Sequence, residues 1–364
     1  MSSKALAAIV SLLLAAASPA AAREPDPRRA ALDRDVPGLL ARHRIPSVSI
    51  AHIEKGRVVL AAAYGEQSPG VSATTRSLYN VASLTKPVSA EVMLRLASAG
   101  RIDLDEPMHR HWTDPDVAAD PRHERLTPRI ALSHRTGFLN WRWLEPDKRL
   151  AFHHAPGEGA GYSGEGYEYA ARYVEKRTGI PFERLAERLV FGPLGMRDTA
   201  YTVRPWFDGR VAIPTDGDGE PIEPVRRRDF VASDDMHTTA SDYARFMVAV
   251  MRRDGVSRGL AAERERVAAS TRHVHCTGAK EASCPTELGF GLGWEVHKYP
   301  GRTILWHTGS DSGEFAVAFL NPDTRTGTVI LTNGRHGFEA VIPILERLGT
   351  DAVFMRALRA QAGR

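Results

Sequence analysis

Ser83-Leu84-Thr85-Lys86 is the stretch on which the interpretation of this sequence rests, and it lies where a helix is expected to begin near Pro87. On a helix, residues three apart share a face, so the ammonium group of Lys86 can lie beside the hydroxyl of Ser83. The amine can then accept the hydroxyl proton, and the positive end of the helix dipole favours developing negative charge. Taken alone, the tetrad favours a simple helix cap at Ser83 over a catalytic role, because Ser-x-x-Lys also occurs by chance.

Two further motifs follow in the chain, each in a setting of its own. Tyr162-Ser163-Gly164 lies in a glycine-rich loop, and His307-Thr308-Gly309 lies at the end of an expected strand from Thr303 to Trp306. The hydroxyl can act as the nucleophile of an acyl transfer, and the amine, the phenol and the imidazole can carry its protons. The three motifs together therefore favour a catalytic interpretation over a helix cap.

The three motifs resemble the signature of the serine β-lactamase and penicillin-binding protein family, which is Ser-x-x-Lys, then Tyr-x-Asn or Ser-x-Asn, then Lys/His-Thr-Gly. Leu132-Ser133-His134-Arg135-Thr136-Gly137 and Gly192-Pro193-Leu194-Gly195-Met196 also look like stretches of that family. The resemblance runs from about Val48 to Leu348. It is greatest to the branch that holds class C β-lactamases, D-alanyl-D-alanine peptidases, D-amino-acid amidases and related esterases.

The resemblance implies a role for each matching residue. Ser83 would be the nucleophile, Lys86 its proton partner, and Tyr162 a base and later an acid. A phenol in water ionises near pH ~10, so a basic Tyr162 needs nearby cations such as Lys86 and a protonated His307. Whether Lys86 or Tyr162 takes the first proton stays open. The residues implied to bind the oxyanion and the substrate are Ser83, Thr308, Gly309 and Ser310, with backbone N–H groups of Ser83 and Ser310 forming the oxyanion hole.

The sequence departs from the family pattern at two positions. Gly164 stands where the family usually has Asn, and His307 replaces the more usual Lys, which makes the positive charge there weaker and dependent on pH. Both departures favour an esterase, D-amino-acid amidase or D-alanyl peptidase that acts through an acyl-enzyme. A class C-like β-lactamase is the first alternative, and a non-catalytic penicillin-binding-like sensor or scaffold is the second.

The expected fold class is α+β and β-lactamase-like. An antiparallel sheet built from both termini would carry flanking helices and an inserted, mostly helical subdomain. Two β-like runs between Val48 and Tyr64 suggest that the chain opens with strands, and further short strands follow from Phe290 to Leu331. One hydrolase domain would span residues 23–364, with the sheet at about 40–75 and 285–364 and the helices at about 76–284.

The N-terminus has the pattern of an export signal. Lys4 precedes an apolar run from Ala5 to Ala17, and Ala20-Ala21-Ala22 offers small residues for cleavage before Arg23. We expect residues 1–22 to be a signal peptide and the mature protein to be periplasmic or secreted, with no stable membrane span after cleavage. In such a compartment Cys276 and Cys284 would pair as a disulfide.

The remaining composition bears on partners and cofactors. The formal charge is only +4 and basic residues are mixed with acidic ones, so nucleic acid is not an expected partner. No cofactor and no metal are expected, because His153-His154 and His273-Val274-His275-Cys276 lack partners at the spacing of a metal motif. The expected partner is a small-molecule or peptide substrate, and the oligomeric state is open.

Overall fold

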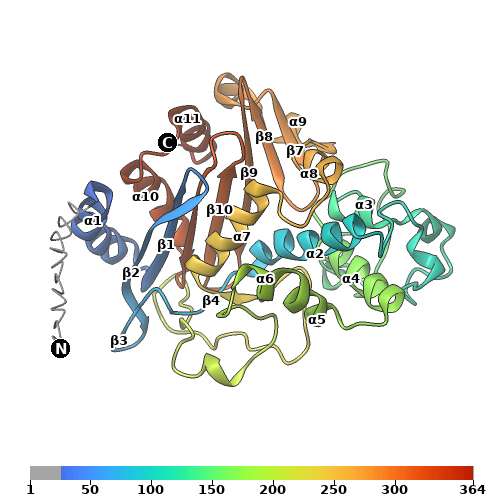
Figure 1. The fold of residues 1–364 in the computed structure, drawn as a ribbon, viewed down its shortest axis with the longest axis horizontal. Helices are drawn as coiled ribbons and strands as arrows, with labels where there is room; N and C mark the ends of the chain where they lie inside the picture. The colour runs from blue at the N-terminus through green and yellow to red at the C-terminus, as the bar shows by residue number, and fades with distance from the viewer. Residues whose placement is uncertain (1–25, 364) are drawn as a thin grey trace, which may run out of the picture.

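The computed structural model describes residues 26–363, and within them the central element is an antiparallel sheet of nine strands (Figure 1). Their spatial order is β3-β2-β1-β11-β10-β9-β8-β7-β6. The strands are β1 Ser47–Glu54, β2 Arg57–Ser68, β3 Val71–Ser72, β6 Ala269–Ser270, β7 Glu287–Phe290, β8 Glu295–Tyr299, β9 Arg302–Ser310, β10 Phe315–Asn321 and β11 Thr326–Thr332. Since β1 pairs with β11, the sheet is built from both ends of the chain, as predicted.

The hairpin between β1 and β2 follows from its turn residues. Lys55 and Gly56 both have positive φ, 50° and 70°. Two such residues in succession make the turn that matches the twist of paired strands. A separate two-stranded sheet joins β4 (Tyr79–Asn80) to β5 (His237–Thr238), just before the Ser83 segment.

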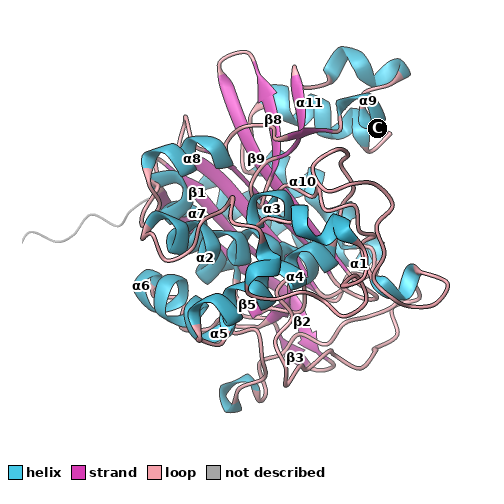
Figure 2. Ribbon diagram, turned by 90° about the vertical axis from the view of Figure 1, so that its right-hand side faces the viewer, coloured by secondary structure: helices cyan, strands magenta, loops and turns pink. Residues whose placement is uncertain are grey.

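Helices cover both faces of the large sheet (Figures 1 and 2). Alternate residues of β1 enter different cores: Ile50 packs with α1, α10 and α11, whereas Ala51 packs with α2, α4 and α7. The helices are α1 Pro27–His43, α2 Lys86–Ser98, α3 Pro128–Leu132, α4 Gly164–Thr178, α5 Phe182–Ala186, α6 Gly192–Leu194, α7 Ala240–Arg252, α8 Arg258–Arg264, α9 Arg272–His275, α10 Val341–Arg347 and α11 Ala352–Gln361. The run from α2 to α9 confirms the predicted helical insertion.

The structure corrects the expectation that the chain opens with strands. Helix α1 precedes β1, and Asp26 caps it by accepting a hydrogen bond from the backbone N–H of Arg28 (3.0 Å). The helix forms although Pro37 lies inside it, because its apolar residues recur at helical spacing and are buried: Leu32, Val36, Leu39 and Leu40. The predicted signal peptide, residues 1–22, lies outside the described residues.

Two features of the periphery complete the fold. Cys276 and Cys284 are joined by a disulfide, with their Cα atoms 5.9 Å apart. Among residues 26–363, no helix has the length and apolar character needed to cross a bilayer.

Candidate active site

Ser83 lies in a tight turn that leads into α2. A single 3₁₀ turn spans Ala82–Thr85, and Lys86 is the first residue of the helix. Ala82 has a φ of 45°, which is strained for a residue with a side chain. The bend is held because the backbone N–H of Ala82 donates to Asn80 Oδ1 (2.8 Å) and Thr85 Oγ1 donates to the carbonyl of Ala82 (2.6 Å).

Lys86 is fully buried beside Ser83. Its Nζ donates to Ser83 Oγ (3.0 Å) and to the carbonyl of Ser233 (2.9 Å). Nζ also lies 4.8 Å from the ring centroid of Tyr162 and 5.8 Å from that of Trp141. No carboxylate in the described part of the chain is within ion-pair distance of it. The ammonium group is therefore held by oxygens and ring faces and has no direct counter-ion.

Tyr162 is positioned by His134. The two rings stack with centroids 4.5 Å apart, and Phe290 packs against the His134 ring at 4.6 Å. His134 Nδ1 accepts a hydrogen bond from the backbone N–H of Ser163 (3.0 Å). Burial, followed by the charge of Lys86, holds the pKa of His134 well below its usual value. A neutral imidazole therefore supports the phenol ring, a role that the sequence did not assign to His134.

His307 reaches the same site from strand β9. Its Nδ1 lies 2.7 Å from the carbonyl oxygen of Thr308, so Nδ1 carries the proton and Nε2 is left as an acceptor. Burial, and then Lys86, lower the pKa of His307 to about 4. With this pKa the imidazole is uncharged at neutral pH, which argues against assistance to Tyr162 by a protonated His307.

Strand β9 and the Ser83 turn are in direct contact. A Cβ on Gly309 would collide with the carbonyl oxygen of Val81, so only glycine allows this approach. A cavity of about 250 Å³ lies beside this contact. Its lining residues are Ser83, His134, Asn140, Tyr162, Phe290, Glu295, His307, Thr308 and Ser310. The structure thus brings the residues of all three motifs together, with Lys86 buried behind Ser83 and Gly309 at the strand contact.

The space beside Gly164 is filled from another segment. A Cβ at position 164 would lie 2.9 Å from the ring of Trp141, which leaves no room for the Asn of the resembled family. The backbone N–H of Gly164 donates to Asn140 Oδ1 (2.8 Å). Because that donor fixes the amide orientation, Asn140 Nδ2 is available at the cavity. Trp143 stacks on Trp141 with ring centroids 4.6 Å apart and is itself 58% exposed.

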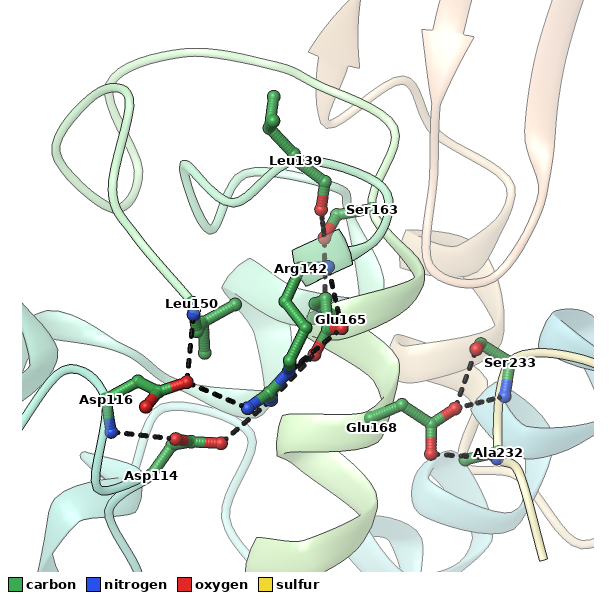
Figure 3. Close-up of polar contacts among 11 residues, drawn as sticks. Asp114, Asp116, Leu139, Arg142, Leu150, Ser163, Glu165, Glu168, Ala232 and Ser233 are labelled. Atoms are coloured by element: carbon green, nitrogen blue, oxygen red, sulfur yellow. Dashed lines mark hydrogen bonds and ion pairs between the residues drawn. The ribbon is translucent and has the colours of Figure 1, made fainter. Parts of the chain in front are cut away.

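Arg142 ties this loop to the start of α4 (Figure 3). Its guanidinium group contacts Glu165 (2.8 Å), Asp114 (2.9 Å) and Asp116 (3.1 Å). These carboxylates raise the pKa of Arg142, so the charge is permanent. Because the guanidinium group of Arg142 bonds to three carboxylates, it fixes the loop more firmly than a single exposed ion pair would. The placement of Asn140 and Trp141 is therefore part of the folded scaffold.

Comparisons with known proteins agree with this geometry. The family model described as Beta-lactamase matches residues 32–349. The D-alanyl-D-alanine-carboxypeptidase/endopeptidase AmpH of Escherichia coli K12 is 26% identical over 294 residues, which cover 74% of each chain. Esterase EstB of Burkholderia gladioli is 33% identical over 183 residues, or 42% of this chain and 45% of the esterase.

A solved structure shows the same fold. The octameric penicillin-binding protein homologue from Pyrococcus abyssi superposes with a TM-score of 0.73 at 20% sequence identity, covering 89% of this chain and 78% of that one. The family match spans the sheet, the inserted helices and all three motifs. The chain therefore belongs to the Beta-lactamase family and is a serine hydrolase of that family.

Proposed function

We propose that this protein hydrolyses ester or amide bonds through an acyl-enzyme on Ser83. The observation that carries the proposal is the 3.0 Å hydrogen bond between Lys86 Nζ and Ser83 Oγ, at a cavity that Tyr162 and His307 also line. A serine next to a buried amine is the arrangement that nucleophilic catalysis requires.

In the first step Ser83 Oγ forms a bond to the substrate carbonyl carbon. The hydroxyl proton passes to Lys86 or to Tyr162, and the carbonyl electrons move to oxygen. Backbone N–H groups of Ser83 and Ser310 donate to that oxyanion. When the intermediate collapses, the bond to the alcohol or amine breaks, and the leaving group takes up the proton that Ser83 released. Water then forms a bond to the acyl carbon while one of its protons passes to Lys86 or Tyr162. The bond to Ser83 Oγ breaks, Oγ takes that proton back, and the carboxylic acid leaves.

The charges around the cavity favour substrates that have no carboxylate next to the scissile bond. Within residues 26–363, no lysine or arginine lines the cavity, and His307 is neutral. A carboxylate bound there would lose water and find no lysine or arginine on the cavity wall, which also carries the carboxylate Glu295. An esterase or amidase activity is therefore favoured over a D-alanyl carboxypeptidase or a β-lactamase, and Asn140 Nδ2 is a donor for the acyl group of the substrate.

The test is to incubate mature protein with a p-nitrophenyl ester and, separately, with a fluorescent penicillin. We expect the ester to turn over, an acyl mass to appear on the Ser83 peptide, and the penicillin not to be hydrolysed. Ser83→Ala is the control and should abolish turnover with nearly unchanged thermal stability. Rapid penicillin hydrolysis would support the class C-like alternative. A folded protein that is acylated by neither reagent would support the scaffold.

We also propose that the protein is exported and that residues 1–22 are removed. The pattern of Lys4, the apolar run and the three alanines supports this, as does the disulfide between Cys276 and Cys284. N-terminal sequencing of protein recovered from the periplasm or medium should begin at Arg23. Recovery of the full chain from the cytoplasm alone would contradict it.

A further inference from the structure

We propose that Glu168 is a positioning residue that holds Lys86 in place by fixing the carbonyl group of Ser233. The inference rests on the proposed function, because the effect of Glu168 is measured as acylation of Ser83. Glu168 does not line the cavity, so its influence on the reaction has to pass through its neighbours.

A short chain of hydrogen bonds connects Glu168 with Lys86 (Figure 3). One carboxylate oxygen accepts from the backbone N–H of Ser233 (2.9 Å) and from its hydroxyl (2.6 Å), and the other accepts from the backbone N–H of Ala232 (3.2 Å). The carbonyl of Ser233 in turn accepts from Lys86 Nζ (2.9 Å). Both carboxylate oxygens are thus committed to the segment that orients the amine.

The segment is also held from the opposite side. Ser89, on α2, donates its hydroxyl hydrogen to the carbonyl of Ala232. The segment of Ala232 and Ser233 is therefore held between α2, which carries Lys86 and Ser89, and α4, which carries Glu168. A main-chain carbonyl on a segment held from both sides is a preorganised acceptor for Lys86.

Glu168 also matters electrostatically. Lys86 has no carboxylate in direct contact within the described chain, and a buried ammonium group without a counter-ion is costly. The pKa of Glu168 is raised, because burial outweighs the hydrogen bonds from Ser233 and Ala232 and the charge of Lys86, which act in the opposite direction. Lys86 thus favours the charged form of Glu168 across Ser233, but the hydrogen bonds to residues 232 and 233 carry the positioning role.

The location of Glu168 on α4 explains how the chain manages without Asn at position 164. Positions 164 and 168 are one helical turn apart and share a face of α4. At 164 the ring of Trp141 excludes any side chain. Support for Lys86 therefore comes from the next turn of this helix, through Ser233.

The test compares Glu168→Gln with Glu175→Gln. Glu175 is a matched control, because it lies on the same helix and accepts from a backbone N–H, that of Phe182 (2.9 Å), outside the cavity. In Glu168→Gln the new side-chain amide would place an NH₂ group against a backbone donor, so the Ser233 carbonyl would shift. We expect kcat for a p-nitrophenyl ester to fall about 10- to 100-fold in Glu168→Gln. KM should change less than about threefold, and the control should be near normal in both constants.

A double-mutant cycle separates positioning from a general structural effect. If Glu168 acts through Lys86, Glu168→Gln should cause no further loss of Ser83 acylation in a Lys86→Ala background, measured by mass in single-turnover reactions. A normal kcat for Glu168→Gln, or the same fold loss in both backgrounds, would overturn the inference alone. Failure of the unmodified protein to acylate Ser83 would instead overturn the proposed function and this inference with it.

A second variant keeps the test decisive if Glu168→Gln does not fold. Ser233→Ala removes the shortest contact to Glu168 and keeps the carbonyl that Lys86 uses. Loss of one such hydrogen bond should lower kcat about three- to tenfold, again only while Lys86 is present. An unchanged kcat in Ser233→Ala would count against the positioning role.

Discussion

Helix α2 carries two buried charged side chains that are stabilised in opposite ways. Glu91 is paired directly with Arg264 at 2.6 Å, and both side chains are almost completely inaccessible, 1% and 0% exposed. Lys86, at the start of the same helix, is equally buried but contacts only oxygens and ring faces. The pair at Glu91 is neutralised and joins α2 to α8. Within residues 26–363 Lys86 has no direct counter-ion, and its amine is held beside Ser83 Oγ instead.

The strongest test of this contrast is Lys86→Met. We expect kcat for an ester to fall by about 10³- to 10⁴-fold, because a proton carrier next to the nucleophile is lost. Thermal stability should stay the same or rise, since an apolar side chain replaces a buried charge that lacks a counter-ion. Ester turnover and thermal unfolding measure the two effects. A large loss of stability would show that Lys86 is as structural as Arg264.

Glu91→Ala should have the opposite outcome. The substitution removes the closest carboxylate of buried Arg264, leaving Glu265 at 3.9 Å, and also removes the partner of Arg95. The free energy of unfolding should therefore fall by about 3–5 kcal/mol. Urea unfolding measures the loss. Activity per folded molecule should remain within about threefold of normal, because Glu91 is not at the cavity. If activity fell while stability stayed unchanged, the assignment of a structural role to Glu91 and a catalytic role to Lys86 would be wrong.

Gly164→Ala tests the packing on the Lys86 side. The new Cβ would lie 2.9 Å from the ring of Trp141, which already faces Lys86. Such overpacking should cost about 1–3 kcal/mol of stability and lower activity as the indole moves. Gly161→Ala is the control, since a Cβ there meets no atom within 4 Å. Equal effects of the two substitutions would argue against the inference that the Trp141 ring fills the space beside Gly164.

The smallest effect concerns pH. Because burial lowers the pKa of His307 to about 4, the neutral form stabilises the folded state fully above about pH 6.5 and loses this contribution as pH falls towards 4. The stability difference between the unmodified protein and His307→Gln should therefore shrink on acidification, by up to about 1.4 kcal/mol per pH unit. Urea unfolding at several pH values measures it. A difference that stays constant with pH would mean that the pKa of His307 is the same in the folded and unfolded states.

Sequence reasoning reached the parts of the molecule that depend on local patterns. Ser83 and Lys86 mark a helix start and His307 a strand, so their settings follow from periodicity and turn residues, although β9 continues past the expected end at Trp306 to Ser310. Helix α1 was missed because Pro37 and the arginines hide its apolar spacing. Asn140, Ser233 and Glu168 were not found because their importance depends on how two loops fold against α4 and α2. No local pattern encodes that arrangement.

The close contact of Gly309 with Val81 has a consequence for engineering. Here a strand of the central sheet and the turn that presents Ser83 meet without an intervening side chain, so the distance between them is set by the main chain and cannot be tuned by mutation. A library aimed at new substrates should keep this contact invariant and randomise position 140, where the cavity wall comes from a loop.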